Sequence, residues 1–449
     1  MSRLFGTDGV RGLANREITA DLSLRLGAAA ARVLGRQGTF EGPRPRAIVG
    51  RDPRVSGQFL SSAMIAGLAS AGVDTEDLGV LPTPAVAYLT GVENADLAVM
   101  ISASHNPMED NGIKFFARGG QKLDDAVEDE IAAALDEEWE RPTHAAVGRI
   151  TLDRGASGER YVEHLLGTLN HDLTGLRIAI DCANGAASEV GPDALRAAGA
   201  DVVVMNASPD GRNINEKCGS THPEQLQAVV VASESDFGVA FDGDADRCLA
   251  VDHTGAIVDG DQILGILASA LQEEGRLPGD TLVVTVMSNL GLILAMRERG
   301  ITTVQTAVGD RYVLEEMRAK GFGLGGEQSG HIILADHATT GDGVLSALHL
   351  AARVKASGKR LADLAGQIER LPQTLVNVRG VDKSRAGTDE GVQTAVADAT
   401  ARLGDTGRVL LRQSGTEPLV RVMVEAPAQD EADKVAEDLA AVVRERLAL

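Results

Sequence analysis

Three aspartates at alternate positions could together hold a metal ion. The segment Asp242-Gly243-Asp244-Ala245-Asp246 follows the apolar residues 238–241, which predict a buried strand. Oxygen ligands of this kind suit Mg²⁺ or Ca²⁺. An EF-hand calcium loop does not fit, because Arg247 and His253 would stand where that loop has glycine and glutamate. We therefore expect Mg²⁺ that shares a phosphate oxygen; an acidic surface turn is the alternative.

A serine and a histidine lie at the end of another apolar stretch. Residues 97–101 predict a buried strand, and Ser102, Ser104 and His105 follow it before an Asn-Pro breaker. Polar loops after strands commonly carry the chemistry of α/β proteins. The Ser104 hydroxyl is therefore a candidate reacting group, although a hydroxyl that caps the following turn is the alternative. No G-x-S-x-G elbow is present, so this loop alone does not establish a nucleophile.

A carboxylate, a hydroxyl and an imidazole lie between glycines in residues 326–331. Glu327, Ser329 and His331 could hydrogen-bond a polyol or act as acid or base, and a structural turn is the alternative. Residues 321–326 match G-x-G-x-x-G formally. A strand-like stretch follows them in place of a helix, so we discard a dinucleotide site. No P-loop motif occurs in the sequence, which argues against a P-loop ATPase.

A phosphate cradle is suggested by a segment of small residues near the C-terminus. Backbone N–H groups, hydroxyls and arginines suited to a phosphate come from Arg412, Ser414, Gly415, Thr416 and Arg421. A hairpin connection is the alternative. Other cations near the candidate loops, each of which could equally form a surface ion pair, are Arg11, Arg51, Lys114 and Arg311.

Alternating strand-like and helix-like stretches must position these loops. Residues 19–35 place Leu22, Leu26 and Val33 on one face and predict an amphipathic helix. Similar alternation continues through three units, and a smaller α+β part begins near residue 371. Asn111-Gly112 predicts a tight turn, and the charged residues 136–158 predict a helix end and a linker. Sheets covered by helices follow from this pattern.

Composition narrows the class of protein. A chain of 449 residues is too long to fold around a single hydrophobic core, and its length suggests three or four domains of about 100–150 residues. The net charge of −22 argues against nucleic acid or an anionic membrane as the main partner. No apolar run of about 18 residues and no signal-peptide core is present, so we expect no membrane span. Three widely separated cysteines are expected to be bystanders in a reducing cytoplasm.

Taken in order, these loops resemble the α-D-phosphohexomutase superfamily over essentially the whole chain. Gln328 favours the branch that acts on glucosamine phosphates, since relatives acting on glucose or mannose phosphates usually carry glutamate there. Ala307 departs from the lysine expected before Val308, which leaves Arg311 to supply a cationic contact. The segments that carry the resemblance are residues 5–12, 101–107, 111–116, 242–247, 308–313, 326–331 and 412–418.

The resemblance implies an isomerase that interconverts glucosamine 6-phosphate and glucosamine 1-phosphate. Ser104 would be phosphorylated and would pass its phosphoryl group to the substrate, giving a 1,6-bisphosphate that turns over and returns the other phosphate. Glucosamine or glucose 1,6-bisphosphate would prime the serine. The product would feed synthesis of UDP-N-acetylglucosamine and cell-wall precursors. The alternatives are a mutase for glucose or mannose phosphates and a Mg²⁺- or sugar-phosphate-binding protein without turnover.

The resemblance also assigns roles to individual residues. Mg²⁺ would be bound by Ser104, Asp242, Asp244 and Asp246. The catalytic residues would be Ser104, His105, Lys114, Arg11, Arg247 and His331. Substrate would be bound by Glu327, Ser329, Arg311, Arg412, Ser414, Gly415, Thr416 and Arg421.

The implied fold is α/β, with three similar strand/helix sandwich domains that have mixed sheets. A smaller C-terminal α+β domain would complete an active site in a central cleft. The expected domains are 1–155 for the phosphoserine, 156–253 for the metal, 254–370 for the sugar and 371–449 for the distal phosphate. The expected partners are small anionic sugar phosphates, with neither nucleic acid nor membrane, and a homodimer is compatible with the resemblance.

Overall fold

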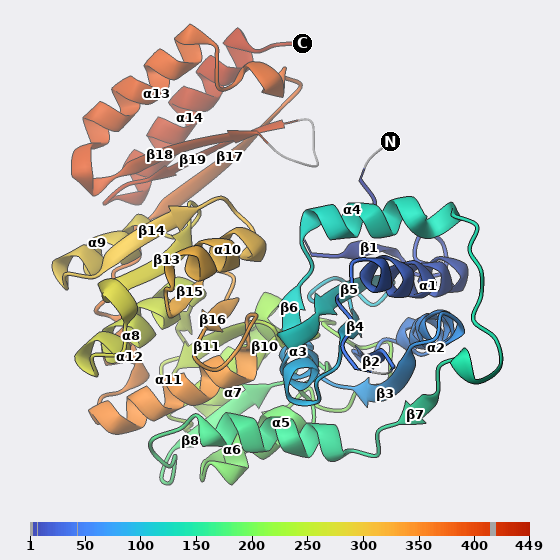
Figure 1. Cartoon of the computed structure of the whole chain (residues 1–449). Helices are drawn as coiled ribbons and strands as arrows, with labels where there is room; N and C mark the ends of the chain where they lie inside the picture. Colours follow the sequence, from blue (N-terminus) through green and yellow to red (C-terminus); the bar gives the residue numbers. More distant parts are fainter. Residues whose placement is uncertain (1–2, 7, 43, 414–418) are drawn as a thin grey trace. The chain divides into compact units, whose positions relative to one another are not determined.

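The computed structural model describes residues 3–6, 8–42, 44–413 and 419–449. The chain divides into two compact units, one of Met1–Met287 with Gly300–Gly366 and one of Ser288–Arg299 with Gln367–Leu449. The larger unit contains three sheets with their helices, and the smaller contains a three-stranded sheet. The predicted fold class, α/β with three strand/helix parts that have mixed sheets and a smaller C-terminal α+β part, is confirmed (Figure 1).

The first sheet has the strand order β1-β5-β4-β2-β3-β7, with β6 paired to β5. Strands β4 and β3 are parallel to β2, whereas β5 is antiparallel to both β4 and β1, so the sheet is mixed. Its strands are β1 (Val10–Leu13), β2 (Arg46–Arg51), β3 (Asp74–Val80), β4 (Leu97–Ile101), β5 (Asp110–Ala117), β6 (Gln121–Lys122) and β7 (Ile150–Leu152). The helices that accompany it are α1 (Ala20–Arg36), α2 (Val55–Ser70), α3 (Thr83–Val92) and α4 (Asp125–Ala133).

Close packing of α1 against α2 fixes this part of the core. Thr19 caps α1 as predicted, since its side chain accepts a hydrogen bond from the backbone N–H of Leu22. A Cβ atom at Gly67 of α2 would lie 2.1 Å from the backbone oxygen of Leu24 in α1. The two helices can approach this closely only because position 67 has no side chain.

Two sequence predictions in this region are corrected by the structure. Asn111-Gly112 forms no turn but lies within β5, where the two residues pair with Gly12 and Arg11 of β1. The Asn111 side chain donates to Ser56 Oγ at 2.8 Å, which satisfies its amide inside the sheet. The predicted linker 136–158 contains β7, whose three residues extend the sheet beside β3.

The second and third sheets repeat the mixed pattern. The second has the order β12-β11-β10-β8-β9, and the third has the order β14-β13-β15-β16. The strands are β8 (Arg177–Asp181), β9 (Asp201–Met205), β10 (Phe237–Phe241), β11 (Cys248–Asp252), β12 (Ile257–Val258), β13 (Thr281–Thr285), β14 (Thr302–Thr306), β15 (Leu324–Gly326) and β16 (Ile332–Leu334). The helices are α5 (Ala156–Gly167), α6 (Val190–Ala197), α7 (Glu224–Ala232), α8 (Gly260–Glu273), α10 (Asp310–Lys320), α11 (Gly343–Ser357) and α12 (Leu361–Ala365).

The smaller unit is an antiparallel sheet of order β17-β19-β18 with its helices. Its elements are β17 (Gln373–Arg379), β18 (Arg408–Gln413), β19 (Leu419–Glu425), α13 (Glu390–Leu403), α14 (Gln429–Arg446) and α9 (Leu290–Glu298). Alternate residues of β19, Val420, Val422 and Val424, are buried in its core. Among the described residues of both units, no helix is long and apolar enough to cross a membrane.

Candidate active site

The loop after β4 holds Ser104 in an unusual conformation. Ser104 is buried and has a φ of +53°, in the left-handed region that non-glycine residues rarely adopt. Its backbone N–H donates to Ser102 Oγ at 2.9 Å, and that hydroxyl donates to Asp52 Oδ2 at 2.6 Å. Side-chain contacts with the backbone therefore hold the conformation in place.

Two side chains from outside this loop donate hydrogen bonds to its carbonyl oxygens. Arg54 donates to the backbone oxygens of Ser104, at 3.1 Å, and of Asn106. Asn215 donates to the same two oxygens at 2.9 and 3.0 Å. Sequence reasoning missed Asp52, Arg54 and Asn215. The signal for the first two was present, because they follow strand β2 directly, as Ser104 follows β4.

The three aspartates of the acidic loop converge as predicted. Asp242, Asp244 and Asp246 follow β10, are buried, and offer ligand atoms within 4.8 Å of one another. Ser104 Oγ donates to Asp242 Oδ2 at 2.5 Å, so the serine joins the cluster. Glycine is required within the loop, since a Cβ at Gly243 would lie 2.6 Å from the Ser104 backbone oxygen.

The donor set fits a divalent cation. The Oδ1 atoms of Asp244 and Asp246 are buried and accept no hydrogen bond from any residue the structure describes. Burial, together with the charges of Asp246 and Asp244, raises the pKa of Asp242 well above its usual value. A bound cation would offset the repulsion between these carboxylates, and hard oxygen ligands match Mg²⁺.

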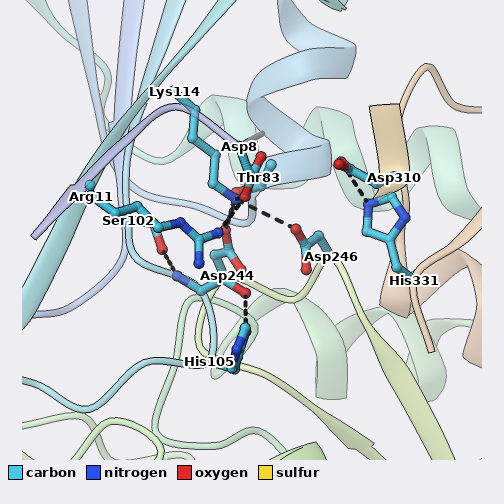
Figure 2. Close-up of polar contacts among 12 residues, drawn as sticks. Asp8, Arg11, Thr83, Ser102, His105, Lys114, Asp244, Asp246, Asp310 and His331 are labelled. Atoms are coloured by element: carbon cyan, nitrogen blue, oxygen red, sulfur yellow. Dashed lines mark hydrogen bonds and ion pairs between the residues drawn. The ribbon is translucent and has the colours of Figure 1, made fainter. Parts of the chain in front are cut away.

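Lys114 supplies positive charge on one side of the cluster (Figure 2). Its Nζ lies 2.9 Å from Asp244 Oδ2, 3.5 Å from Asp246 Oδ2 and 3.0 Å from Asp8 Oδ2. Burial opposes the charged form, but Asp244, Asp8 and Asp246 outweigh it and raise the pKa of Lys114. Burial likewise opposes ionisation of Asp244, yet Lys114 and a hydrogen bond from Thr83 at 2.6 Å lower the pKa of that carboxyl. Lys114 therefore holds its proton.

Asp8 forms further ion pairs. It lies in the segment 5–12 that carries the family resemblance, but no role was predicted for it. Its carboxylate contacts Arg11, and it lies 2.7 Å from Lys122 Nζ, which in turn contacts Asp310. Figure 2 shows Asp310 beside His331, whose Nε2 is 3.7 Å from Asp310 Oδ2. Consecutive ion pairs thus connect residues in and beside the first sheet with Asp310, the first residue of α10.

The two candidate histidines differ in environment. His105 Nδ1 lies 3.3 Å from Ser104 Oγ. Burial and the nearby charges of Arg247 and Arg11 lower the pKa of His105 to about 4, so the ring is neutral at neutral pH. His331 is buried, and neither ring nitrogen has a hydrogen-bond partner among the residues the structure describes.

A cavity of about 530 Å³ opens beside the cluster within the larger unit. Several predicted site residues line it, together with Asp8 and Asp310: Arg11, His105, Asp246, Arg247, Glu327 and His331. Glu327 Oε1 accepts a hydrogen bond from the backbone N–H of Gly309 at 3.2 Å. Ser329 Oγ is buried and has no partner among the described residues, and Gln328 Nε2 donates to Asp259 Oδ2 at 3.4 Å.

The remaining predicted residues lie elsewhere. Arg311 contacts α4, where its Nη2 is 3.2 Å from Glu128 Oε2 and it also pairs with Asp125. Arg412 and Arg421 are opposite each other in β18 and β19 of the smaller unit. Ser414, Gly415 and Thr416 lie outside the described residues. Arg51 pairs with Asp77 at 3.0 Å, and Cys182, Cys218 and Cys248 are buried free thiols.

Comparison with family models covers most of the chain. The four models of phosphoglucomutase/phosphomannomutase match in order: α/β/α domain I over residues 2–142, domain II over 159–255, domain III over 259–371 and the C-terminal domain over 375–442.

Individual proteins agree with this result. A relative from Nocardioides sp. named phosphoglucosamine mutase is 62% identical over 449 residues, which is 100% of both chains. The crystal structure of a phosphoglucomutase/phosphomannomutase family protein from Burkholderia thailandensis has a TM-score of 0.83 and 25% identity, covering 99% of this chain and 98% of that one. Aspergillus fumigatus N-acetylphosphoglucosamine mutase, solved with GlcNAc-6P and magnesium, has a TM-score of 0.62 over 81% of this chain and 92% of that one. At 22% identity, this last likeness concerns the fold alone.

Proposed function

The chain belongs to the phosphoglucomutase/phosphomannomutase family, and we propose that it interconverts glucosamine 6-phosphate and glucosamine 1-phosphate. The relative at 62% identity over the full length carries the name of that activity. Activity mainly on glucose or mannose phosphates is not favoured. The product is suited to the synthesis of UDP-N-acetylglucosamine and cell-wall precursors.

The observation that carries the mechanism is the hydrogen bond between Ser104 Oγ and Asp242 in the acidic cluster. Ser104 carries the transferable phosphoryl group in the active enzyme. A substrate hydroxyl attacks phosphorus, so a sugar O–P bond forms while the bond from phosphorus to Ser104 Oγ breaks. The sugar hydroxyl gives up its proton and Ser104 Oγ gains one, which restores the serine hydroxyl. The resulting 1,6-bisphosphate reverses its orientation, and Ser104 Oγ then takes the other phosphate by the same exchange. A glucosamine or glucose 1,6-bisphosphate primes an unphosphorylated serine.

Mg²⁺ would be held by Asp242, Asp244 and Asp246 with the serine phosphate, where it would supply charge neutralisation for phosphoryl transfer. Lys114 keeps its proton and adds positive charge beside Asp244. Arg11 and Arg247 line the cavity and can bind the oxygens of the transferring group. His105, 3.3 Å from Ser104 Oγ, is the group we assign to proton exchange at that oxygen.

Sugar recognition is assigned to the loop 326–331. Glu327 lines the cavity and the buried Ser329 hydroxyl has an unused hydrogen-bonding capacity among the described residues, so both could bind sugar hydroxyls. His331 lines the same cavity and could bind substrate or exchange a proton. Arg311 fits this role less well, because α4 occupies its guanidinium.

We assign the four proposed roles to four consecutive segments of the chain. Residues 1–155 carry the phosphoserine, 156–253 the metal ligands, 254–370 the sugar contacts and 371–449 the contacts to the distal phosphate. The last group consists of Arg412, Ser414, Gly415, Thr416 and Arg421.

A coupled assay with a panel of hexosamine and hexose phosphates tests the proposal. We expect kcat/KM for glucosamine 1-phosphate to exceed the values for glucose 1-phosphate and mannose 1-phosphate. Peptide mass spectrometry should find one added phosphate on Ser104. The Ser104→Ala variant should fold normally and lose activity by orders of magnitude, because it lacks the oxygen that accepts phosphorus. Near-normal turnover of that variant would rule out the phosphoserine mechanism.

A further inference from the structure

The residues that line the cavity of about 530 Å³ differ in charge according to the segment they come from. The parts of the lining that precede residue 308 include Arg11 and Arg247, which suit the phosphate groups of the substrate. Segment 308–331 contributes two carboxylates, Asp310 and Glu327, and no lysine or arginine among the described residues. A substrate that bore only phosphates and hydroxyls would bring no positive charge to these two carboxylates.

Asp310 is held in place and carries its charge. It is the first residue of α10, and its Oδ1 accepts a hydrogen bond from the backbone N–H of Arg311 at 2.8 Å. Its Oδ2 contacts Lys122 Nζ. Burial opposes ionisation of Asp310, but Lys122 outweighs that effect and lowers the pKa of the carboxyl. The side chain is therefore negative at neutral pH.

The negative charge of Asp310 is less fully balanced than that of Asp8. Asp8 lies 3.0 Å from Lys114 Nζ and 2.7 Å from Lys122 Nζ, and it also pairs with Arg11. Within the described part of the chain, Lys122 is the only lysine or arginine that pairs with Asp310, and Asp8 shares it. Each carboxylate oxygen can accept more than one hydrogen bond. Asp310 can therefore accept a further donor from the cavity that it lines.

The proposed substrate carries a matching donor. Glucosamine phosphates differ from glucose phosphates only at carbon 2, which bears an amino group in place of a hydroxyl. Like an α-amino group, such an amine titrates at about pH 8, so most of it is an ammonium group at neutral pH. An ammonium group donates hydrogen bonds, accepts none, and pairs best with a carboxylate.

Among the carboxylates of the lining, Asp310 is the one left for this group. Asp246 belongs to the candidate metal site, and Asp8 already has three cationic partners. Glu327 and Ser329 lie two residues apart in the loop assigned to sugar hydroxyls, which amino sugars and hexoses share.

We propose that the Asp310 carboxylate binds the 2-ammonium group of glucosamine phosphates and so selects them over hexose phosphates with a 2-hydroxyl. This inference rests on the proposed function and adds the residue that recognises the amino sugar. A hydroxyl in the same place can donate a hydrogen bond but brings no charge to offset the carboxylate. A bound sugar also removes water from Asp310, and the cost of that desolvation is offset less by a hexose phosphate.

The Asp310→Asn variant of the full chain tests the proposal, with kcat/KM measured for glucosamine 1-phosphate and for glucose 1-phosphate. Because the two substrates differ only at carbon 2, their ratio cancels any general damage to folding or to phosphoryl transfer. We expect the preference for glucosamine 1-phosphate to fall about 10- to 100-fold, as for loss of a hydrogen bond between charged groups. Lys122 still pairs with Asp8 in the variant, so the melting temperature should change little.

Two further variants show whether the effect belongs to Asp310. Glu327→Gln should lower kcat/KM for both substrates by similar factors, because both bring the hydroxyls assigned to Glu327. Asp336→Asn removes a carboxylate from the same part of the chain, where the side chain is 62% exposed and lies 3.8 Å from Arg276. This control should leave both values as in the wild type.

The pH dependence of the ratio is a second readout. In the wild type the ratio should fall as the pH rises from about 7 to about 9, because the substrate amine loses its proton in this range. The titratable groups beside Asp310 are Lys122, Asp8 and His331, and their titration affects both substrates and cancels in the ratio. In Asp310→Asn the ratio should depend much less on pH, since no carboxylate then faces the nitrogen.

The outcomes separate this inference from the proposed function. A wild type without a preference for glucosamine 1-phosphate overturns both. A wild-type preference that survives unchanged in Asp310→Asn overturns this inference alone, and so does a preference that falls as far in Glu327→Gln as in Asp310→Asn. Loss of the preference and of its pH dependence in Asp310→Asn alone supports the inference.

Discussion

The backbone N–H of Ser104 donates a hydrogen bond to the hydroxyl of Ser102 at 2.9 Å. Two residues earlier in the same loop, Ser102 thus supports the left-handed conformation that presents Ser104 Oγ to Asp242. The nearby serine therefore has a positioning role, while Ser104 is the proposed reacting group.

Replacement of Ser102 by alanine should lower kcat more than it changes KM. The variant leaves the Ser104 N–H without its acceptor, and loss of one buried hydrogen bond costs about 1–3 kcal/mol. We expect kcat to fall about tenfold or more, since small misplacements of a reacting group are costly. Steady-state kinetics with thermal melting measure both effects. Ser62→Ala, which removes an exposed helical hydroxyl, is the matched control and should behave like the wild type.

Asp244→Asn should weaken metal-dependent activity. The substitution removes a negative charge from the acidic cluster and from the environment of Lys114. We expect a chelator to abolish wild-type activity, Mg²⁺ to restore it, and the variant to need much more Mg²⁺ and to reach a lower maximum. Titration of activity against Mg²⁺ measures this. Activity that responds to Mg²⁺ as in the wild type would remove Asp244 from the metal site.

Gln328→Glu should destabilise the loop 326–331, to which we assign sugar recognition. The Gln328 amide donates to Asp259 Oδ2 at 3.4 Å, so a glutamate would place a second carboxylate beside the first. We expect a lower melting temperature at pH 7.5 than in the wild type, and a smaller difference near pH 5, where one carboxyl of the pair is more readily protonated. Differential scanning calorimetry at both pH values measures the effect. A difference in melting temperature that does not change with pH would contradict this explanation.

His349 should make stability depend on pH below neutrality. Burial, then the nearby His337 and Arg276, lower the pKa of His349 from 6.5 to about 4. Between these values the unfolded chain binds a proton that the folded chain does not, so the free energy of unfolding decreases as pH falls through this range. His349→Gln removes the titration and can keep the contact with Thr168 Oγ1, which is 3.0 Å from His349 Nε2. Urea unfolding between pH 7.5 and pH 4.5 should show a shallower decline for the variant, and an identical decline would exclude His349 as a source.

Local patterns predicted many elements well. The apolar run before Ser104 coincides with β4, and the strand before the acidic loop coincides with β10 to within one residue. The turn predicted at Asn111-Gly112 failed because tertiary contacts outweighed local preference: β1 pairs with these residues, and Ser56 accepts the hydrogen bond of the asparagine amide. Strand β7 went unrecognised because three residues carry too little periodicity to reveal a strand.

The sequence by itself determined which loops were rich in reactive groups, because a strand that ends in polar residues is visible in the order of the letters. Asp242, Asp244, Asp246 and Ser104 became candidates in this way, whereas Glu327 became one because it lies between glycines beside a hydroxyl and an imidazole. Only the tertiary structure decided which of these groups meet. It brings Ser104 to Asp242, 138 positions apart in sequence, and Lys114 to Asp244, 130 apart. It also turns Arg311 toward α4, since side-chain direction and ion pairing depend on neighbours that local sequence does not specify.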